Sequence, residues 1–160
     1  MPRDVPVADV MNTDVVVFSP DELVQAAAER MVERSVDAGP VVDEGGKVIG
    51  MLSSTDLIVR ESRMHLPTVI SILGATLELP SQKRRFDEEV EKALGSTVAE
   101  VMSDAARTVG PNDTVETAAT LMYDHDVSRL AVVDERGVLM GIIARGDILR
   151  AIVQAGRAAT

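Results

Sequence analysis

The chain has 160 residues, no cysteine and a formal net charge of −10, and 46% of its residues are hydrophobic although it contains only two Phe and one Tyr. This length suits one ordinary domain or two very small ones, with a core built from aliphatic side chains. Without thiols the chain has no disulfide, cysteine-ligated zinc or thiol nucleophile, and its acidity argues against binding long nucleic acid, although local Arg residues can serve one phosphate group. No apolar run approaches the roughly 20 residues of a membrane helix, and the first residues have no apolar signal core. We therefore expect a cytoplasmic protein that does not interact with membranes.

The chain contains an internal repeat, in which residues 7–60 correspond to residues 98–151. At an offset of 91, the difference between Met102 and Met11, the two segments are identical at 17 of 54 positions without a gap. Two copies are too few for a solenoid. We therefore expect two repeats that pack on each other with pseudo-twofold symmetry.

Each copy is predicted to open with a short helical turn, at Val7 to Met11 and at Val98 to Met102. A brief strand should follow, from Val15 to Phe18 in the first copy and, more weakly, from Arg107 to Val109 in the second. Ser19-Pro20-Asp21-Glu22 then predicts a helix with Ser19 as its N-cap, because Pro at the first position and Glu three residues after the cap favour a helix start.

Apolar residues recur at helical spacing after each of these starts, so each copy should bury one face of its first helix. These residues are Leu23, Val24, Ala27, Met31 and Val32 in the first copy, and Val115, Ala118, Ala119 and Met122 in the second. Two strands follow within residues 40–56 and 131–147, joined by an acidic turn whose Gly supplies a positive φ. A last helix is expected from Thr55 to Ser62 and from Gly146 to Gln154.

This pattern predicts an α+β fold of two βαββα units, residues 5–62 and 96–155. Residues 63–95 form an insert with two expected helices, one from Leu66 to Leu73 and one capped by Ser81. We expect the insert to pack on the core of the pair or on a second subunit.

A polar turn closed by an aspartate, Asp56 or Asp147, follows the last strand of each copy. In the first copy the aspartate could simply complete a capping box with Ser53. The second copy has Ala144 at that position, so an aspartate kept without its capping partner suggests another role. A carboxylate can accept two hydrogen bonds from a ribose diol, and the hydroxyls of Ser53 and Thr55 sit beside it at a helix N-terminus that suits a phosphate.

Two arginines could add positive charge in the second copy. Arg145 lies beside Asp147, and Arg129 lies at the start of a predicted strand. Arg129 is either a solvated side chain or ion-pair partner, or a phosphate clamp, since its forked donors are always charged. The equivalent residue of the first copy is Ala38, so the first site has less positive charge.

Catalysis has little support in the sequence. His65 and His125 have no Cys or second His nearby, and metal binding by either is not expected. The motifs of serine hydrolases, phosphate-binding loops and zinc proteases are missing. We expect neither an enzyme nor a metal site.

The paired motifs resemble the cystathionine-β-synthase (CBS) domain, in the tandem arrangement called a Bateman module. The resemblance rests on Gly50 to Asp56, Val127 to Asp134 and Gly141 to Asp147, and it spans roughly residues 5–62 and 96–155. It implies a ligand-sensing module, usually not an enzyme and without a catalytic cofactor. The clefts of such modules commonly bind AMP, ADP, ATP or S-adenosylmethionine.

By this resemblance, Asp56 and Asp147 would hold ribose hydroxyls, Ser53 and Thr55 would contact ribose or phosphate, and Arg129 would contact phosphate. Backbone and apolar atoms around the adenine would come from near Thr13, Val15, Ala105 and Arg107, and from near Ala38, Pro40, Ser128 and Ala131. Whether each aspartate shares its ligand with its own copy or with the other is left open by the sequence.

The sequence departs from the family pattern in two places. Ala144 replaces a usual hydroxyl, for which Arg145 could compensate, and Asp37-Ala38-Gly39 replaces a basic residue. Because Asp37 could repel phosphate, the cleft of the second copy is the preferred site for an anionic nucleotide. The cleft of the first copy is either empty or suited to adenosine-like or cationic ligands.

These observations together predict a non-catalytic regulatory module. It would sense AMP, ADP or ATP between the repeats and pass the change to a partner protein that the sequence does not identify. The alternatives are a structural dimerisation or adaptor module with degenerate clefts, and a sensor of S-adenosylmethionine. Helix faces rich in Ala and Val lead us to expect a disc-like homodimer.

Overall fold

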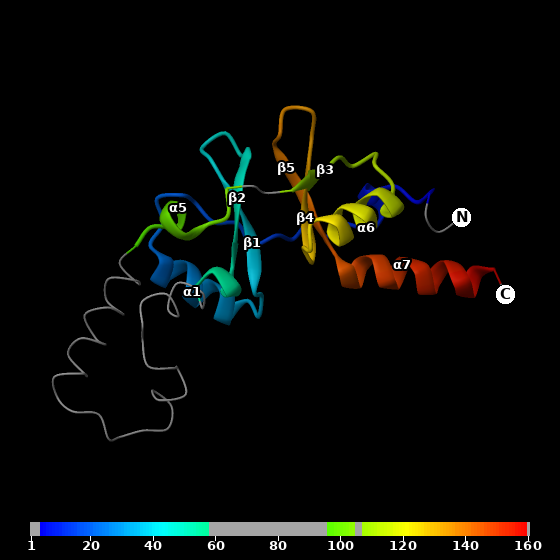
Figure 1. Ribbon diagram of the computed structural model, residues 1–160, viewed down its shortest axis with the longest axis horizontal. Helices are drawn as coiled ribbons and strands as arrows, with labels where there is room; N and C mark the ends of the chain where they lie inside the picture. Colours follow the sequence, from blue (N-terminus) through cyan, green and yellow to red (C-terminus); the bar gives the residue numbers. More distant parts are fainter. Residues whose placement is uncertain (1–3, 58–95, 105–106, 160) are drawn as a thin grey trace, which may run out of the picture.

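The computed structural model describes residues 4–57, 96–104 and 107–159, and Figure 1 shows them as two halves side by side. The first half contains α1 (Val24–Glu33), β1 (Ala38–Val42) and β2 (Val48–Ser53). The second half contains β3 (Thr108–Val109), α6 (Val115–Asp124), β4 (Arg129–Val133), β5 (Leu139–Ala144) and α7 (Arg145–Ala158). Two short helices, η2 (Val7–Asp9) and α5 (Val98–Val101), precede the halves in sequence. The predicted α+β repeats are confirmed, whereas the predicted helical insert at 63–95 lies outside the described residues.

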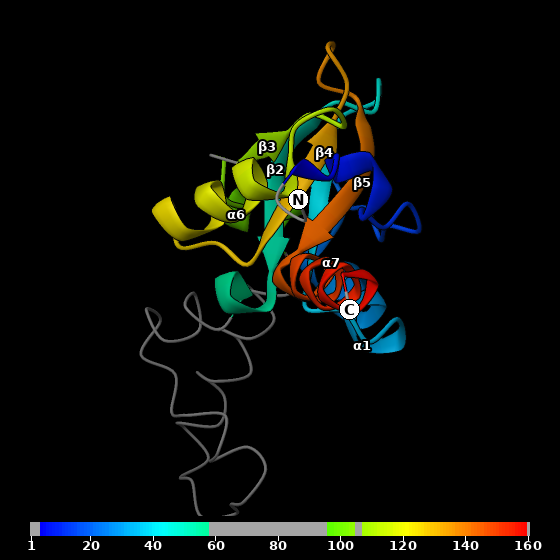
Figure 2. The same cartoon turned by 90° about the vertical axis from the view of Figure 1, so that its right-hand side faces the viewer.

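Each half is built on an antiparallel hairpin with the same register. Ala38 pairs with Ser53 in the first hairpin, and Arg129 pairs with Ala144 in the second. The turns contain Gly46 and Gly137, whose φ values are 82° and 83°, so the predicted positive-φ glycines are confirmed. Figure 2 looks onto the second half, where α6 packs on β4 and α7 packs on β5.

The tips of the two hairpins are joined to each other. The N–H of Val48 donates to the carbonyl of Gly137 at 3.1 Å, and the N–H of Leu139 donates to the carbonyl of Gly46 at 3.0 Å. Because these bonds connect backbone to backbone, they do not depend on the identity of the side chains. The tips therefore set the spacing of the two halves at one end.

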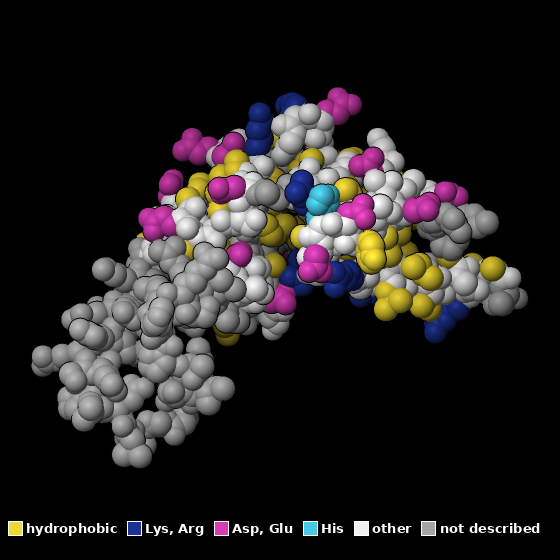
Figure 3. Space-filling model, in the orientation of Figure 1, with side chains coloured by type: hydrophobic (Ala, Val, Ile, Leu, Met, Phe, Trp, Pro, Cys, Tyr) yellow, Lys and Arg dark blue, Asp and Glu magenta, His cyan; other side chains and the backbone are white. Residues whose placement is uncertain are grey.

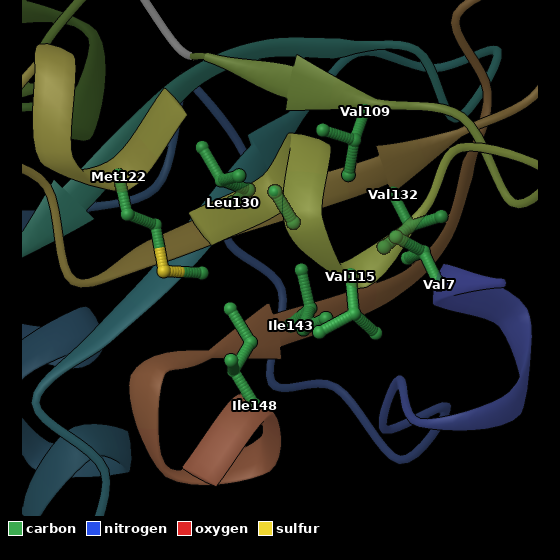
Figure 4. Packing of buried hydrophobic residues seen from close by; sticks show 9 residues of the cluster. Val7, Val109, Val115, Met122, Leu130, Val132, Ile143 and Ile148 are labelled. Carbon is green, nitrogen blue, oxygen red and sulfur yellow. The ribbon is translucent and has the colours of Figure 1, made fainter. Parts of the chain in front are cut away.

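The opening segment of each repeat packs on the other half. Val7 is fully buried in the core of the second half, where Figure 4 shows it among Val115, Val132 and Ile143. Val98, the equivalent residue, is fully buried in the core of the first half. Each packing unit therefore takes its first short helix from the other repeat. This exchange links the halves more tightly than contact between two finished domains would.

Two glycines permit this exchange. A Cβ added to Gly50 would lie 2.8 Å from the carbonyl oxygen of Ser103 and 2.6 Å from the sulfur of Met102. At Gly141 the same atom would lie 2.8 Å from the carbonyl oxygen of Asn12 and 2.9 Å from the sulfur of Met11. The segments that cross to the other half, residues 6–12 and 97–103, are here called the crossing segments. They also bond to the strands: Ser103 is bonded to Met51, and Asn12 to Ile142, through both backbone groups.

Two local predictions in the first repeat were wrong. The N-cap of α1 is not Ser19 but Leu23, four residues later, because Leu23 is extended and forms a bridge with Thr97 of the crossing segment. The Glu22 carboxylate still accepts the Ser19 N–H at 3.2 Å, so the capping residues close a turn rather than a helix. The expected strand from Val15 to Phe18 is reduced to one parallel bridge between Phe18 and Val41.

Candidate functional site

A pocket of about 330 Å³ lies where the two halves meet, a volume within the range of small-molecule sites. The first half contributes Asp37, Ala38, Met51 and Ser53–Asp56 to its lining. The second repeat contributes Ser103, Arg107 and Asp126–Arg129. Asp56 therefore lines one pocket together with residues of its own repeat and of the other repeat.

Asp56 is held at the end of β2 by a complete capping box. Its Oδ2 accepts from the backbone N–H of Ser53 at 2.9 Å and from the Ser53 hydroxyl at 3.0 Å, and the Asp56 N–H donates to that hydroxyl at 3.2 Å. Among the described residues, the hydrogen bonds of the Asp56 side chain use Oδ2, and none uses Oδ1. The carboxylate is fixed through one oxygen, which leaves the other for the pocket.

Asp147 occupies the equivalent position but lies outside the lining of this pocket. Its Oδ2 accepts from the Ala144 N–H at 2.8 Å, and its Oδ1 is paired with Arg150. The sequence argument inferred a second role because Asp147 has no capping side chain at residue 144, but Asp147 still caps the backbone there. The carboxylate caps a backbone N–H, and this hydrogen bond requires no side chain at residue 144.

Arg129 begins β4 and projects into the pocket, where it meets Asp37 of the first half. Nη1 of Arg129 lies 2.5 Å from Oδ1 of Asp37, and the two side chains are 28% and 68% exposed. The sequence allowed Arg129 to be a solvated side chain, an ion-pair partner or a phosphate clamp. In the described residues it is an ion-pair partner. The phosphate-clamp interpretation of Arg129 stays a prediction.

The pocket contains three carboxylates, from Asp37, Asp56 and Asp126, and two guanidinium groups, from Arg107 and Arg129. Its formal charge is therefore −1, the difference between two positive and three negative groups. Asp126 is positioned by a left-handed backbone with φ of 50°, and it also lies 3.8 Å from Arg145. A pocket of this charge accepts a ligand with one anionic group only where that group meets an arginine.

The remaining predicted site residues are scattered. Pro40 and Ala131 are buried within the sheets, paired with Met51 and Ile142. Thr13 is exposed and Val15 is half-buried, and neither lines this pocket. Ala105 lies outside the described residues. Other predicted residues line the pocket: Ala38, Ser53, Thr55, Arg107 and Ser128.

Several lining residues were not predicted as ligand contacts, namely Asp37, Met51, Ser54, Ser103, Asp126 and Val127. Met51 and Ser103 are joined by the crossing-segment hydrogen bonds, whose partners are 52 positions apart and therefore invisible to local patterns. Asp126 had a detectable signal, since Asp tolerates the left-handed conformation at a helix end.

Among the described residues, no three side chains of His, Asp or Glu gather in a way that could hold a metal ion. In the same part of the chain, each helix is too short or too polar to cross a bilayer.

Comparison with known proteins gives one consistent result. The CBS domain family matches the chain twice, at residues 7–62 and 98–154. The protein YhcV of Bacillus subtilis, a CBS domain-containing protein, is 32% identical over 89% of this chain and 81% of its own length. CBSX1, a chloroplastic CBS domain-containing protein of Arabidopsis thaliana, is 33% identical over 90% of this chain, which spans 61% of the length of CBSX1. The crystal structure of CBSX2 in complex with AMP, also from Arabidopsis thaliana, is 27% identical and superposes with a TM-score of 0.72 over 95% of this chain and 98% of that chain.

Proposed function

Because this chain belongs to the CBS domain family and carries two CBS domains, we propose that it is a non-catalytic regulatory module that senses an adenosine-containing ligand, with AMP, ADP and ATP as the candidates. The observation that carries this proposal is the pocket between the halves, which brings the carboxylate of Asp56 and the guanidinium of Arg129 to one site. The presence of AMP in the CBSX2 structure supports the choice of ligand class.

In this proposal, the free Oδ1 of Asp56 accepts hydrogen bonds from the ribose hydroxyls, because its Oδ2 is already fixed by Ser53. Ser53 and Thr55 lie beside the ribose and the phosphate. Arg129 and Arg107 supply the positive charge for the phosphate. The backbone near Ala38 and Ser128 borders the adenine.

Asp147 and Arg145 would serve a second, pseudo-equivalent site. Arg150 already engages Oδ1 of Asp147, the oxygen that corresponds to the open one in Asp56. We therefore place the main nucleotide site at Asp56 and Arg129, rather than wholly within the second repeat. A ligand that bridges the halves would change their relative orientation, and a partner protein with different affinity for the two arrangements would respond.

S-Adenosylmethionine is the second candidate ligand, since the pocket has a formal charge of −1 and Asp37 could face a sulfonium cation. Adenosine, AMP, ATP and S-adenosylmethionine compared by calorimetry distinguish these ligands. An adaptor with degenerate clefts would bind none of them at millimolar concentration.

A matched pair of variants tests the site. Asp56→Asn should weaken AMP binding by about tenfold, because an amide accepts fewer hydrogen bonds from the ribose. Asp147→Asn makes the same chemical change outside this pocket, so AMP affinity at the Asp56 site should change less than twofold, whatever the effect at the second site. Calorimetric titration of both variants gives the affinities and the number of sites, and equal losses would refute the assignment to Asp56.

We further propose that the partner for the exposed helix surface is a second copy of the chain. Leu149, Ile152 and Val153 lie on one side of α7 at helical spacing and are 62%, 50% and 45% exposed. Figure 3 shows hydrophobic atoms gathered along this helix. A second α7 would cover this apolar side symmetrically. Sedimentation measures the association state, and a monomer at all concentrations would exclude the homodimer.

A further inference from the structure

The ion pair between Asp37 and Arg129 joins the two halves inside the pocket itself. Asp37 directly precedes β1, and Arg129 is the first residue of β4, so the pair connects the starts of equivalent strands. The guanidinium is the more sheltered partner at 28% exposure, whereas the carboxylate is 68% exposed. The pair is thus a link between the halves whose acidic side is open to solvent.

The backbones of both partners are fixed, although the Asp37 side chain is exposed. The carbonyl of Asp37 accepts the N–H of Ser54 at 2.8 Å, and Arg129 is held in the β4–β5 hairpin opposite Ala144. An ion pair with an exposed partner adds little to stability. A competing anion can therefore take the place of the Asp37 carboxylate without disturbing either backbone.

A phosphate group is such an anion. It offers three oxygens to a forked guanidinium, whereas Asp37 contacts Nη1 through Oδ1. The same phosphate would be repelled by the Asp37 carboxylate if that carboxylate stayed in place. Arg129 cannot serve both anions in full, and the ligand must compete for it.

We propose that Asp37 competes with the phosphate of the bound nucleotide for Arg129, an inference that rests on the proposed function. When the phosphate binds Arg129, it breaks the ion pair that joins the two halves. The adenosine part binds at Asp56 with the pair intact, and the phosphate part opens it. Asp37 is thereby the residue that sets the preference between nucleoside and nucleotide. The phosphate, rather than the adenine, is the part of the ligand that changes the contact between the halves.

The test compares adenosine and AMP on the full chain by calorimetry. Asp37→Asn should raise the affinity for AMP about fivefold or more while changing that for adenosine less than twofold. Asp126→Asn is the matched control, because it removes the same charge from the same pocket without touching Arg129, and its gain for AMP should be clearly smaller. Asp37→Ser, which introduces the residue that the second repeat carries at Ser128, should reproduce the effect of Asp37→Asn.

A double variant isolates the competition. In an Arg129→Met background, Asp37→Asn should raise the AMP affinity no more than Asp126→Asn does. The reason is that no guanidinium remains for Asp37 to release. Equal gains from Asp37→Asn and Asp126→Asn with Arg129 present would overturn the competition and leave only a general charge effect. If adenosine and AMP both bind but their affinity ratio does not respond to Asp37, the competition alone is refuted. If neither binds to the natural chain or to any variant, the proposed function fails and this inference fails with it.

Discussion

The polar turns that end β2 and β5 occupy equivalent places in the two halves, yet only the first lines the pocket between the halves described above. In both, an aspartate accepts the backbone N–H three residues earlier, at 2.9 Å for Asp56 and 2.8 Å for Asp147. The environments differ because Arg107 and Arg129 of the second half line the pocket with Asp56. The positions equivalent to those arginines in the first half, at the offset of 91, are Val16 and Ala38.

This difference separates two reasons for an aspartate to be present. The local reason is the cap, and it applies equally to both halves. The second reason, under the proposed function, depends on the groups that the opposite repeat contributes, and both arginines that line the Asp56 pocket come from the second repeat. A duplicated chain can therefore keep the same fold twice while giving its two polar turns different surroundings.

The largest change in stability is expected at the crossing segments, where the two halves should behave alike. Gly50→Ala and Gly141→Ala should each destabilise the protein by about 2–3 kcal/mol, because the added methyl would clash with the backbone of the crossing segment. Denaturant unfolding measures both values. Gly146→Ala is the control, since its Cβ would meet only the Arg150 side chain at 3.6 Å, and it should be neutral or slightly stabilising. A loss at one glycine but not at its counterpart would break the equivalence of the halves.

A smaller effect should sharpen the comparison of the two turns. Ser53→Ala removes a hydroxyl that accepts the Asp56 N–H, and it should cost about 1 kcal/mol of stability. Ala144→Ser supplies the missing hydroxyl in the second half and should stabilise it by about 0.5–1 kcal/mol. Thermal unfolding of the two reciprocal variants tests this, and changes of the same sign would contradict the capping account.

The repeat, the hairpins and their Gly turns could be predicted because they depend on neighbours close in sequence. Gly46 and Gly137, for example, follow from turn chemistry alone. The start of α1 could not, since Leu23 is drawn into a bridge with Thr97, which lies 74 positions away. That Asp56 and Arg129 line the same pocket depends on the packing of the two halves, and local patterns do not encode that packing.

The smallest effect concerns the hairpin turns and pH. The Val138 N–H, together with that of Arg136, donates to the Asp134 carboxylate and lowers the pKa of Asp134 below its ordinary value of 3.8. Since the folded pKa is depressed, this contribution to stability is complete above pH 4 or so and is lost as the pH falls through the lowered pKa. Asp134→Asn should therefore show a flatter decline in stability from about pH 4 downwards than the natural chain.

Asp43→Asn makes the same change in the first hairpin, where Asp43 accepts from Gly45 and Lys47 at 2.9 Å. Denaturant midpoints of the two variants across this pH range show whether the two turns are equivalent, and an unchanged acid limb in Asp134→Asn would remove the turn hydrogen bonds as its cause.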